Sequence, residues 1–187
     1  IKNSDVVYIS IGTGVGSAIM YNGQLIRGVN NAAGEIGHSK FREKGRKCDC
    51  GRYGCLQTYL TEIDTIKSAK KTLPEINTFD ELFELYLDNN PEAIRIIDNL
   101  CEFIAIAINN IAYIYNPEYI LVAGKLIFSF PKLFDISYPK IKPLMHSSLY
   151  EKLIIEKVEN PDNAAYGASL SAQTLYLDIL LEKYNDF

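Results

Sequence analysis

The stretch DVVYISIGTGVGSAIMYNGQLIRG, residues 5–28, carries the fold signal from which the rest of the chain can be interpreted. Residues 5–11 form a β-rich apolar run, and strand-like residues resume after Gly16. Asn22 and Gly23 then stand between two strand-like segments, and this dipeptide is the strongest short signal for a β-hairpin. The pattern therefore predicts that the glycine-rich loop GTGVG, residues 12–16, joins one strand to another.

The GTGVG loop is a candidate phosphate site. It is not a Walker loop, because no Gly-Lys-Ser/Thr follows it, and it is not a dinucleotide-binding turn, because no helix follows it. Its backbone N–H groups can converge on a phosphate, and Thr13 adds a hydroxyl. The candidate phosphate-binding residues are Gly12, Thr13, Gly14 and Gly16. The alternative is a tight hairpin whose glycines serve geometry alone.

A polar loop further along, HSKFREKGRKCDCGRYGC at residues 38–55, holds one of the two histidines and three of the four cysteines. Cys48 and Cys50 are too close together to favour a relaxed disulfide, although Cys55 could pair with either. With His38 they make a Cys₃His set, which is common at tetrahedral structural zinc sites. The spacing therefore favours zinc, and a loop of reduced thiols without metal is the alternative.

The same loop is rich in basic residues. They are expected to form a solvated face and comprise Lys40, Arg42, Lys44, Arg46, Lys47 and Arg52. The C-x-C start departs from the usual C-x₂₋₄-C spacing of zinc fingers, so an independent DNA-reading finger is not expected.

Composition sets the broad class of the protein. The chain has 187 residues, 48% hydrophobic and 22% charged, with a net charge of −4. This acidic balance argues against a general nucleic-acid binder, and no apolar run approaches the roughly 20 residues of a membrane span. Because a strand-like run begins almost at Ile1, we expect a fragment that lacks at least one upstream domain.

The rest of the chain alternates strands with helices, which predicts an α/β fold in one domain, residues 1–187, with a zinc-bearing loop at 38–55. The long apolar helix between Asn90–Pro91 and Asn116–Pro117 should be buried against a sheet. Cys101 is expected in the core and His146 on the surface. The other expected elements are helices at 59–73, 78–89 (capped by Thr78) and 162–184, an interrupted helix in 130–150, and strands at 118–124 and 151–160.

Two motifs together, IGTGVGSAIMYNGQLIRGVNNAAGEIGH at 11–38 and CDCGRYGCLQ at 48–57, resemble the ROK family, which groups sugar-responsive repressors with sugar kinases. The likeness runs from Asp5 to about Tyr59. It continues more loosely through NPEAIRIIDNL, NPEYILVAGKL and DNAAYGASL. The resemblance implies the larger C-terminal lobe of an actin-like (ribonuclease H-like) ATPase, with a mixed sheet flanked by helices.

The resemblance also implies roles for individual residues. The GTGVG loop corresponds to the family's second phosphate loop, and His38, Cys48, Cys50 and Cys55 correspond to its zinc ligands. Glu35 and His38 correspond to residues that bind sugar hydroxyls, with Asn30 as a further contact. At Gln57 the family has a sugar-binding Glu, and a neutral amide can still hydrogen-bond a sugar.

Two further departures concern catalysis. The turn Ala123–Gly124–Lys125 stands where the family has successive glycines, which argues against efficient ATP binding and leaves ATP a doubtful cofactor beside zinc. The family kinases' catalytic Asp lies upstream of the second phosphate loop, and no residue here corresponds to it. Because phosphoryl transfer needs a positioned base, this chain alone is expected not to be catalytic.

The resulting expectation is a sugar-sensing, oligomerising domain of a cytoplasmic ROK repressor. It would bind a small-molecule sugar, form a homodimer, contact DNA only through a missing upstream domain and have no membrane partner. The alternatives are the C-terminal lobe of an ATP-dependent hexose or amino-sugar kinase and a structural zinc module without sugar affinity.

Overall fold

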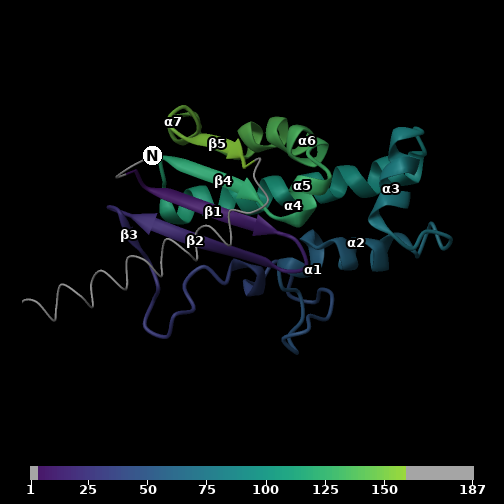
Figure 1. Ribbon diagram of the computed structural model, residues 1–187, viewed down its shortest axis with the longest axis horizontal. Helices are drawn as coiled ribbons and strands as arrows, with labels where there is room; N and C mark the ends of the chain where they lie inside the picture. Colours follow the sequence, from purple (N-terminus) through teal and green to yellow (C-terminus); the bar gives the residue numbers. More distant parts are fainter. Residues whose placement is uncertain (1–3, 159–187) are drawn as a thin grey trace, which may run out of the picture.

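The structure, a computed structural model, describes residues 4–158, in which five strands form one mixed sheet in the order β3-β2-β1-β4-β5 (Figure 1). Neighbours β1–β2 and β2–β3 are antiparallel, whereas β1–β4 and β4–β5 are parallel. The strands are β1 (Val6–Ile11), β2 (Val15–Tyr21), β3 (Gln24–Leu25), β4 (Tyr119–Ala123) and β5 (Ile154–Lys157). The predicted strands and the mixed sheet are confirmed.

The glycine loop joins β1 to β2, as predicted, with Ile11 paired to Val15 across the turn. The β2–β3 turn has positive φ at both Asn22 (49°) and Gly23 (73°). Positive φ at both central residues is the geometry of a two-residue hairpin turn that matches strand twist. The backbone N–H of Asn22 also donates to Asp5 Oδ1 at 2.7 Å, which ties the turn to the start of β1.

Helices cover the sheet and lie in the connections between β3 and β4 and between β4 and β5. They are η1 (Ile36–His38, a 3₁₀ turn), α1 (Gln57–Leu60), α2 (Glu62–Ala69), α3 (Phe79–Leu87), α4 (Pro91–Tyr115), α5 (Lys125–Ser129), α6 (Lys132–Ile141), η2 (Lys142–Leu144) and α7 (Ser147–Tyr150). Thr78 caps α3 with a complete capping box, which confirms the predicted start. The predicted closing helix at 162–184 lies outside the described residues.

The prediction of one helix over 59–73 is wrong. Thr61 has an extended ψ of 151° and separates α1 from α2, and its side chain accepts a hydrogen bond from the backbone N–H of Asp64. A Thr that caps the following turn competes with continuation of the preceding helix. The acidic residues Glu62 and Asp64 in the first turn of α2 support the new start.

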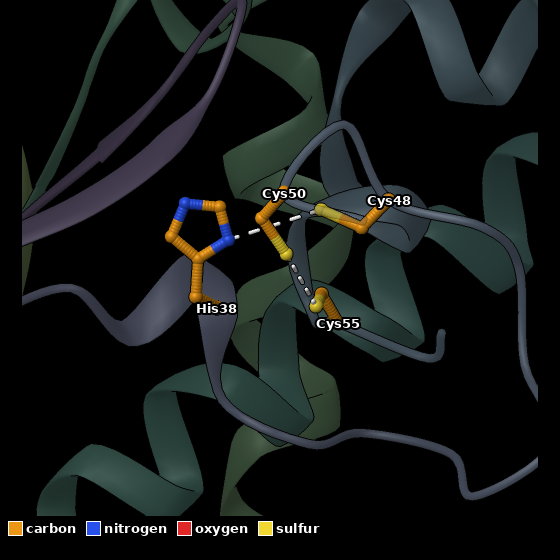
Figure 2. Close-up of side chains that lie close together, drawn as sticks. All are labelled: His38, Cys48, Cys50 and Cys55. Atoms are coloured by element: carbon orange, nitrogen blue, oxygen red, sulfur yellow. Dashed lines mark hydrogen bonds between the residues drawn. The ribbon is translucent and has the colours of Figure 1, made fainter. Parts of the chain in front are cut away.

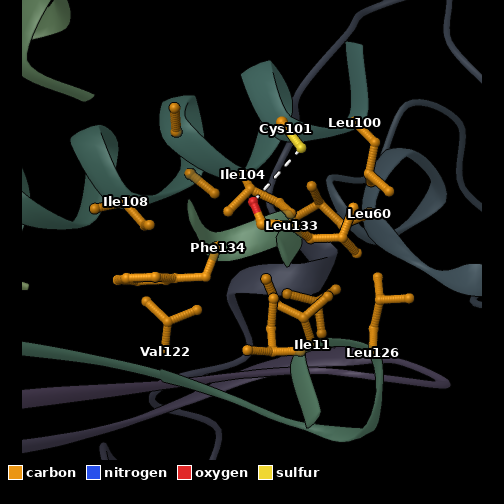
Figure 3. Packing of buried hydrophobic residues seen from close by; sticks show 14 of the residues in the cluster. Ile11, Leu60, Leu100, Cys101, Ile104, Ile108, Val122, Leu126, Leu133 and Phe134 are labelled. Carbon is orange, nitrogen blue, oxygen red and sulfur yellow. Dashed lines mark hydrogen bonds between the residues drawn. The ribbon is translucent and has the colours of Figure 1, made fainter. Parts of the chain in front are cut away.

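Helix α4 is the centre of the core. It begins with Pro91 at the first turn, after Asn90 whose side chain accepts from two backbone N–H groups, and ends at Asn116 with φ 44°. In Figure 3 its apolar side chains face the sheet, with residues of α6 packed between them. Cys101 is fully buried there and its Sγ lies 3.5 Å from the carbonyl oxygen of Leu133, as a core cysteine would.

Within residues 4–158, one helix, α4, is long and apolar enough to cross a membrane, but 56% of its most apolar window is buried inside the protein. Packing against the sheet and α6 therefore accounts for its composition. His146 is exposed, as predicted, and stands edge-on to Tyr113 at 6.1 Å between ring centroids.

Candidate functional site

The two ends of the cysteine loop are held side by side by backbone pairing. Lys40 bridges to Cys55, and the N–H of Leu56 donates to the carbonyl oxygen of Ser39 at 3.0 Å. This pairing brings His38, at the end of η1, next to Cys55, at the start of α1. At the loop tip, the N–H of Cys48 donates to the carbonyl oxygen of Arg52 at 2.8 Å and reverses the chain.

As a result, the four predicted zinc ligands converge (Figure 2). One donor atom from each of His38, Cys48, Cys50 and Cys55 lies within 4.8 Å of all the others. Cys48 Sγ is 3.8 Å from His38 Nδ1, and the sulfurs of Cys50 and Cys55 are 3.7 Å apart.

These separations fit a tetrahedral zinc ion. With Zn–S bonds of about 2.3 Å and Zn–N bonds of about 2.0–2.1 Å, tetrahedral angles place sulfur atoms roughly 3.8 Å apart and sulfur and nitrogen roughly 3.6 Å apart. Two edges already have this length, and the longest needs to close by only about 1 Å. When bound, zinc would supply a fixed positive charge that keeps the thiolates and the imidazole in place.

The thiols are not equivalent. Cys48 and Cys55 are 2% and 1% exposed, whereas Cys50 is exposed. Burial, together with the neighbouring thiols, raises the pKa of Cys55 to about 11, while a hydrogen bond from the backbone of Arg52 lowers the pKa of Cys50. A cation offsets the cost of a buried thiolate, so the cluster is chemically suited to a metal.

An aromatic cluster explains how a polar loop buries two thiols. The rings of Phe41, Tyr59 and Phe103 pack at centroid distances of 5.0–5.6 Å. Phe41 belongs to the loop, Tyr59 to α1 and Phe103 to α4. The loop is therefore fastened to the core through one of its own side chains, which its composition did not indicate.

Arg46 is a second anchor, and the prediction that it belongs to a solvated basic face is wrong. It is half-buried, and its guanidinium lies 4.7 Å from the centroid of Tyr59 and donates to the carbonyl oxygen of Thr58 at 2.7 Å and to Ser68 Oγ at 2.8 Å. Burial lowers the pKa of this guanidinium. Arg46 is one of six basic residues in the loop, and nothing in the sequence distinguishes it from the other five.

The segment before His38 is docked on β2 through two glycines. The N–H of Ser17 donates to the carbonyl oxygen of Gly34 at 2.7 Å. A Cβ at Gly34 would stand 1.9 Å from the carbonyl oxygen of Ser17, and one at Gly37 would stand 2.1 Å from that of Val15. Only glycine permits this approach, which brings His38 beside the start of β2.

The predicted sugar-binding residues lie on three connected segments. Glu35 is exposed immediately before η1, three residues ahead of His38, and Asn30 is exposed in the preceding loop. Gln57, at the first position of α1, donates from Nε2 to Cys48 Sγ at 3.4 Å. Figure 2 shows the second ring nitrogen of His38 facing away from the thiols. His38 and Gln57 therefore meet at Cys48, whereas Asn30 lies further back along the chain.

The predicted phosphate loop lies beside the start of α5. The N–H of Gly12 donates to the carbonyl oxygen of Gly14 at 2.9 Å, while Thr13 and Gly14 are exposed. A Cβ at Gly12 would lie 3.5 Å from the backbone nitrogen of Lys125. The structure thus brings together the glycine loop and the Ala123–Gly124–Lys125 turn, and Lys125 also pairs with Glu62 at 3.9 Å.

Comparison with known proteins identifies the family of the chain. The model of the ROK family matches residues 2–174. The xylose repressor of Bacillus subtilis is 28% identical over 149 residues, which cover 79% of this chain and 38% of the repressor. The glucokinase of Halalkalibacterium halodurans is 31% identical over 135 residues, which cover 64% of this chain and 41% of the kinase. The chain therefore spans about two fifths of the length of these relatives.

Solved structures share the fold. The ROK hexokinase from Thermus thermophilus has a TM-score of 0.75 at 20% identity, covering 82% of this chain and 51% of the hexokinase. A ROK family transcriptional regulator, a homologue of the Escherichia coli MLC protein, has a TM-score of 0.69 at 25% identity, covering 82% of this chain and 41% of the regulator. Repressors and sugar kinases are thus both among its relatives, and the chain belongs to the ROK family.

Proposed function

We propose that residues 1–187 form one domain, the C-terminal lobe of a ROK transcriptional repressor, which binds a sugar beside a structural zinc ion held by His38, Cys48, Cys50 and Cys55. The observation that carries this proposal is the convergence of four donor atoms within 4.8 Å, with the second ring nitrogen of His38 directed away from them. An imidazole held by a metal through one nitrogen can donate a hydrogen bond from the other.

Glu35 supplies the complementary acceptor. It is exposed and separated from His38 by a single 3₁₀ turn, in which side chains three residues apart eclipse one another. A carboxylate beside an imidazole N–H offers both acceptors and a donor to a polyol. Asn30 and Gln57 are the further polar groups that we assign to the same ligand.

Several features favour a repressor over a kinase. Gln57 and the Ala123–Gly124–Lys125 turn both depart from the family's pattern, and the Gly12 N–H is used inside its own loop. The xylose repressor aligns over 79% of the chain and the glucokinase over 64%. In this proposal the whole protein is a cytoplasmic homodimer that binds DNA through an upstream domain, and sugar shifts it between operator-competent and incompetent states.

Calorimetry on the zinc-loaded whole protein tests the sugar site, with xylose, glucose and N-acetylglucosamine as ligands. Glu35→Gln should weaken binding of the best sugar by about 10- to 150-fold, because a hydrogen bond to a charged group contributes about 1.5–3 kcal/mol. Glu43→Gln is the matched control, since Glu43 is an exposed carboxylate on the cysteine loop. Equal affinities for the wild type and Glu35→Gln would contradict the assignment, and operator binding insensitive to all sugars would contradict the repressor.

A sugar kinase is the second candidate, because the glycine loop lies against the Lys125 turn and a glucokinase is 31% identical. Sugar-dependent consumption of ATP by the whole protein would support it. The absence of ATP consumption with any hexose or amino sugar that binds would exclude it.

A further inference from the structure

We infer that Gln57 is a positioning residue for the metal centre, whose side-chain N–H holds the sulfur of Cys48 in place for the ion. This inference rests on the zinc site of the proposed function. It gives Gln57 a second role, in addition to the contact with the sugar assigned above.

The first step of the argument is the position of Cys48 within the cluster. Cys48 is 2% exposed, and two polar groups approach its sulfur: His38 Nδ1 at 3.8 Å and Gln57 Nε2 at 3.4 Å. The histidine is a fellow ligand. The amide of Gln57 is a hydrogen-bond donor to the ligand sulfur from outside the ligand set.

The second step is the orientation of the amide. Gln57 begins α1, directly after the loop, and its Oε1 lies toward Gly14 and Gly37, 3.9 and 3.2 Å from where their Cβ atoms would stand. The missing side chain at Gly37 leaves room for this oxygen. The side chain therefore spans from the glycine loop to the thiol, with its nitrogen on the sulfur side.

The third step is chemical. A thiolate that accepts an N–H···S hydrogen bond carries less charge and has a defined direction, and such outer partners typically change metal affinity 10- to 100-fold. The Glu that the family has at this position cannot donate in its ionised form. The N–H···S hydrogen bond to Cys48 therefore depends on the amide that this chain carries at position 57.

The test compares Gln57→Met, which keeps the length but removes the donor, with Gln24→Met, a control at an exposed glutamine in β3. Zinc affinity of the whole protein is measured by chelator competition, and thiolate-to-metal charge-transfer bands are recorded with Co²⁺. We expect Gln57→Met to bind zinc about 10- to 100-fold more weakly and to shift the Co²⁺ bands, whereas Gln24→Met matches the wild type.

The outcomes separate this inference from the proposed function. Zinc binding by Gln57→Met within threefold of the wild type, with unchanged Co²⁺ bands, overturns the inference and leaves the zinc site intact. A wild type that binds neither metal overturns both. A second measurement needs no variant: on zinc loading, the side-chain amide protons of Gln57 should shift and exchange more slowly while those of Gln24 do not, and an unchanged Gln57 signal also overturns the inference.

Discussion

Replacing Cys55 by Ser should abolish most of the stabilisation by zinc while leaving the metal-free protein nearly as stable as the wild type. At a free zinc concentration 1,000 times the Kd, binding adds about 4.1 kcal/mol to the free energy of unfolding. For a chain of this size each kcal/mol raises Tm by about 2–4 °C. Zinc should therefore raise the Tm of the wild type by roughly 8–16 °C.

The variant removes one of four donors that lie within 4.8 Å of one another, and a serine hydroxyl does not replace a thiolate. If the site weakens 100-fold, about 2.8 kcal/mol of the stabilisation is lost, and the zinc-induced rise in Tm falls to roughly 3–5 °C. Differential scanning calorimetry with and without zinc measures both states of each protein.

Cys101→Ala is the matched control because Cys101 is buried but lies on α4, among the core residues rather than in the cluster. Losing its sulfur should lower the stability of the metal-free protein by about 1 kcal/mol, comparable to a buried methylene, and leave the zinc-induced shift intact. A full zinc-induced shift in Cys55→Ser would refute the four-ligand site. A shift lost equally in both variants would show that the effect is not local.

Three further predictions follow from the structure. Gly37→Ala should lower both Tm and zinc affinity, because its Cβ would stand 2.1 Å from the carbonyl oxygen of Val15. Gly16→Ala is the control and should lower neither, because nothing lies within 4 Å of its Cβ. Thermal melts and zinc titrations measure both variants, and equal Tm and zinc affinity in the two would contradict the reasoning. Thr78→Ala should cost about 1 kcal/mol through loss of the capping box, measured by urea denaturation, and an unchanged midpoint would argue against the cap. Burial raises the pKa of Cys101 from 9.0 to about 11. Between these two pH values the folded state keeps a proton that the unfolded state loses. The free energy of unfolding of the metal-free protein should therefore fall as pH rises from 9 to 11, by at most about 1.4 kcal/mol per pH unit. Denaturation midpoints across this range should fall less steeply for Cys101→Ala, and identical slopes would contradict the assignment.

Local sequence patterns were sufficient for much of the fold. The Asn22–Gly23 turn, the Thr78 cap and the Pro91 start each depend on residues within a few positions of one another, and each is present in the structure. The one helix expected over 59–73 failed for a reason that is also local, since Thr61 caps the second half instead of continuing the first. That signal was present in the sequence and was outweighed by the apolar periodicity around it.

The metal cluster was predictable as a set of residues because its chemistry is unusual. A gathering of soft ligands in a chain with two histidines and four cysteines needs no knowledge of the fold. The distances between the donors are a different matter, because they depend on the pairing of Lys40 with Cys55 and on the packing of Phe41 against Phe103. The residue types indicate which side chains could be ligands, but only the folded backbone brings them within one coordination sphere.

The sequence by itself thus determined the strands, the hairpin turn, the central helix and the identity of the candidate ligands, because each is encoded by short-range periodicity or by distinctive side chains. Only the tertiary structure decided that Arg46 is buried over Tyr59, that Gln57 donates to Cys48 and that the glycine loop lies beside Lys125. These contacts join residues whose types are common and whose partners are set by how helices and loops pack. A common side chain takes on a specific role only when tertiary packing places a particular neighbour beside it, and no local sequence pattern predicts which neighbour that is.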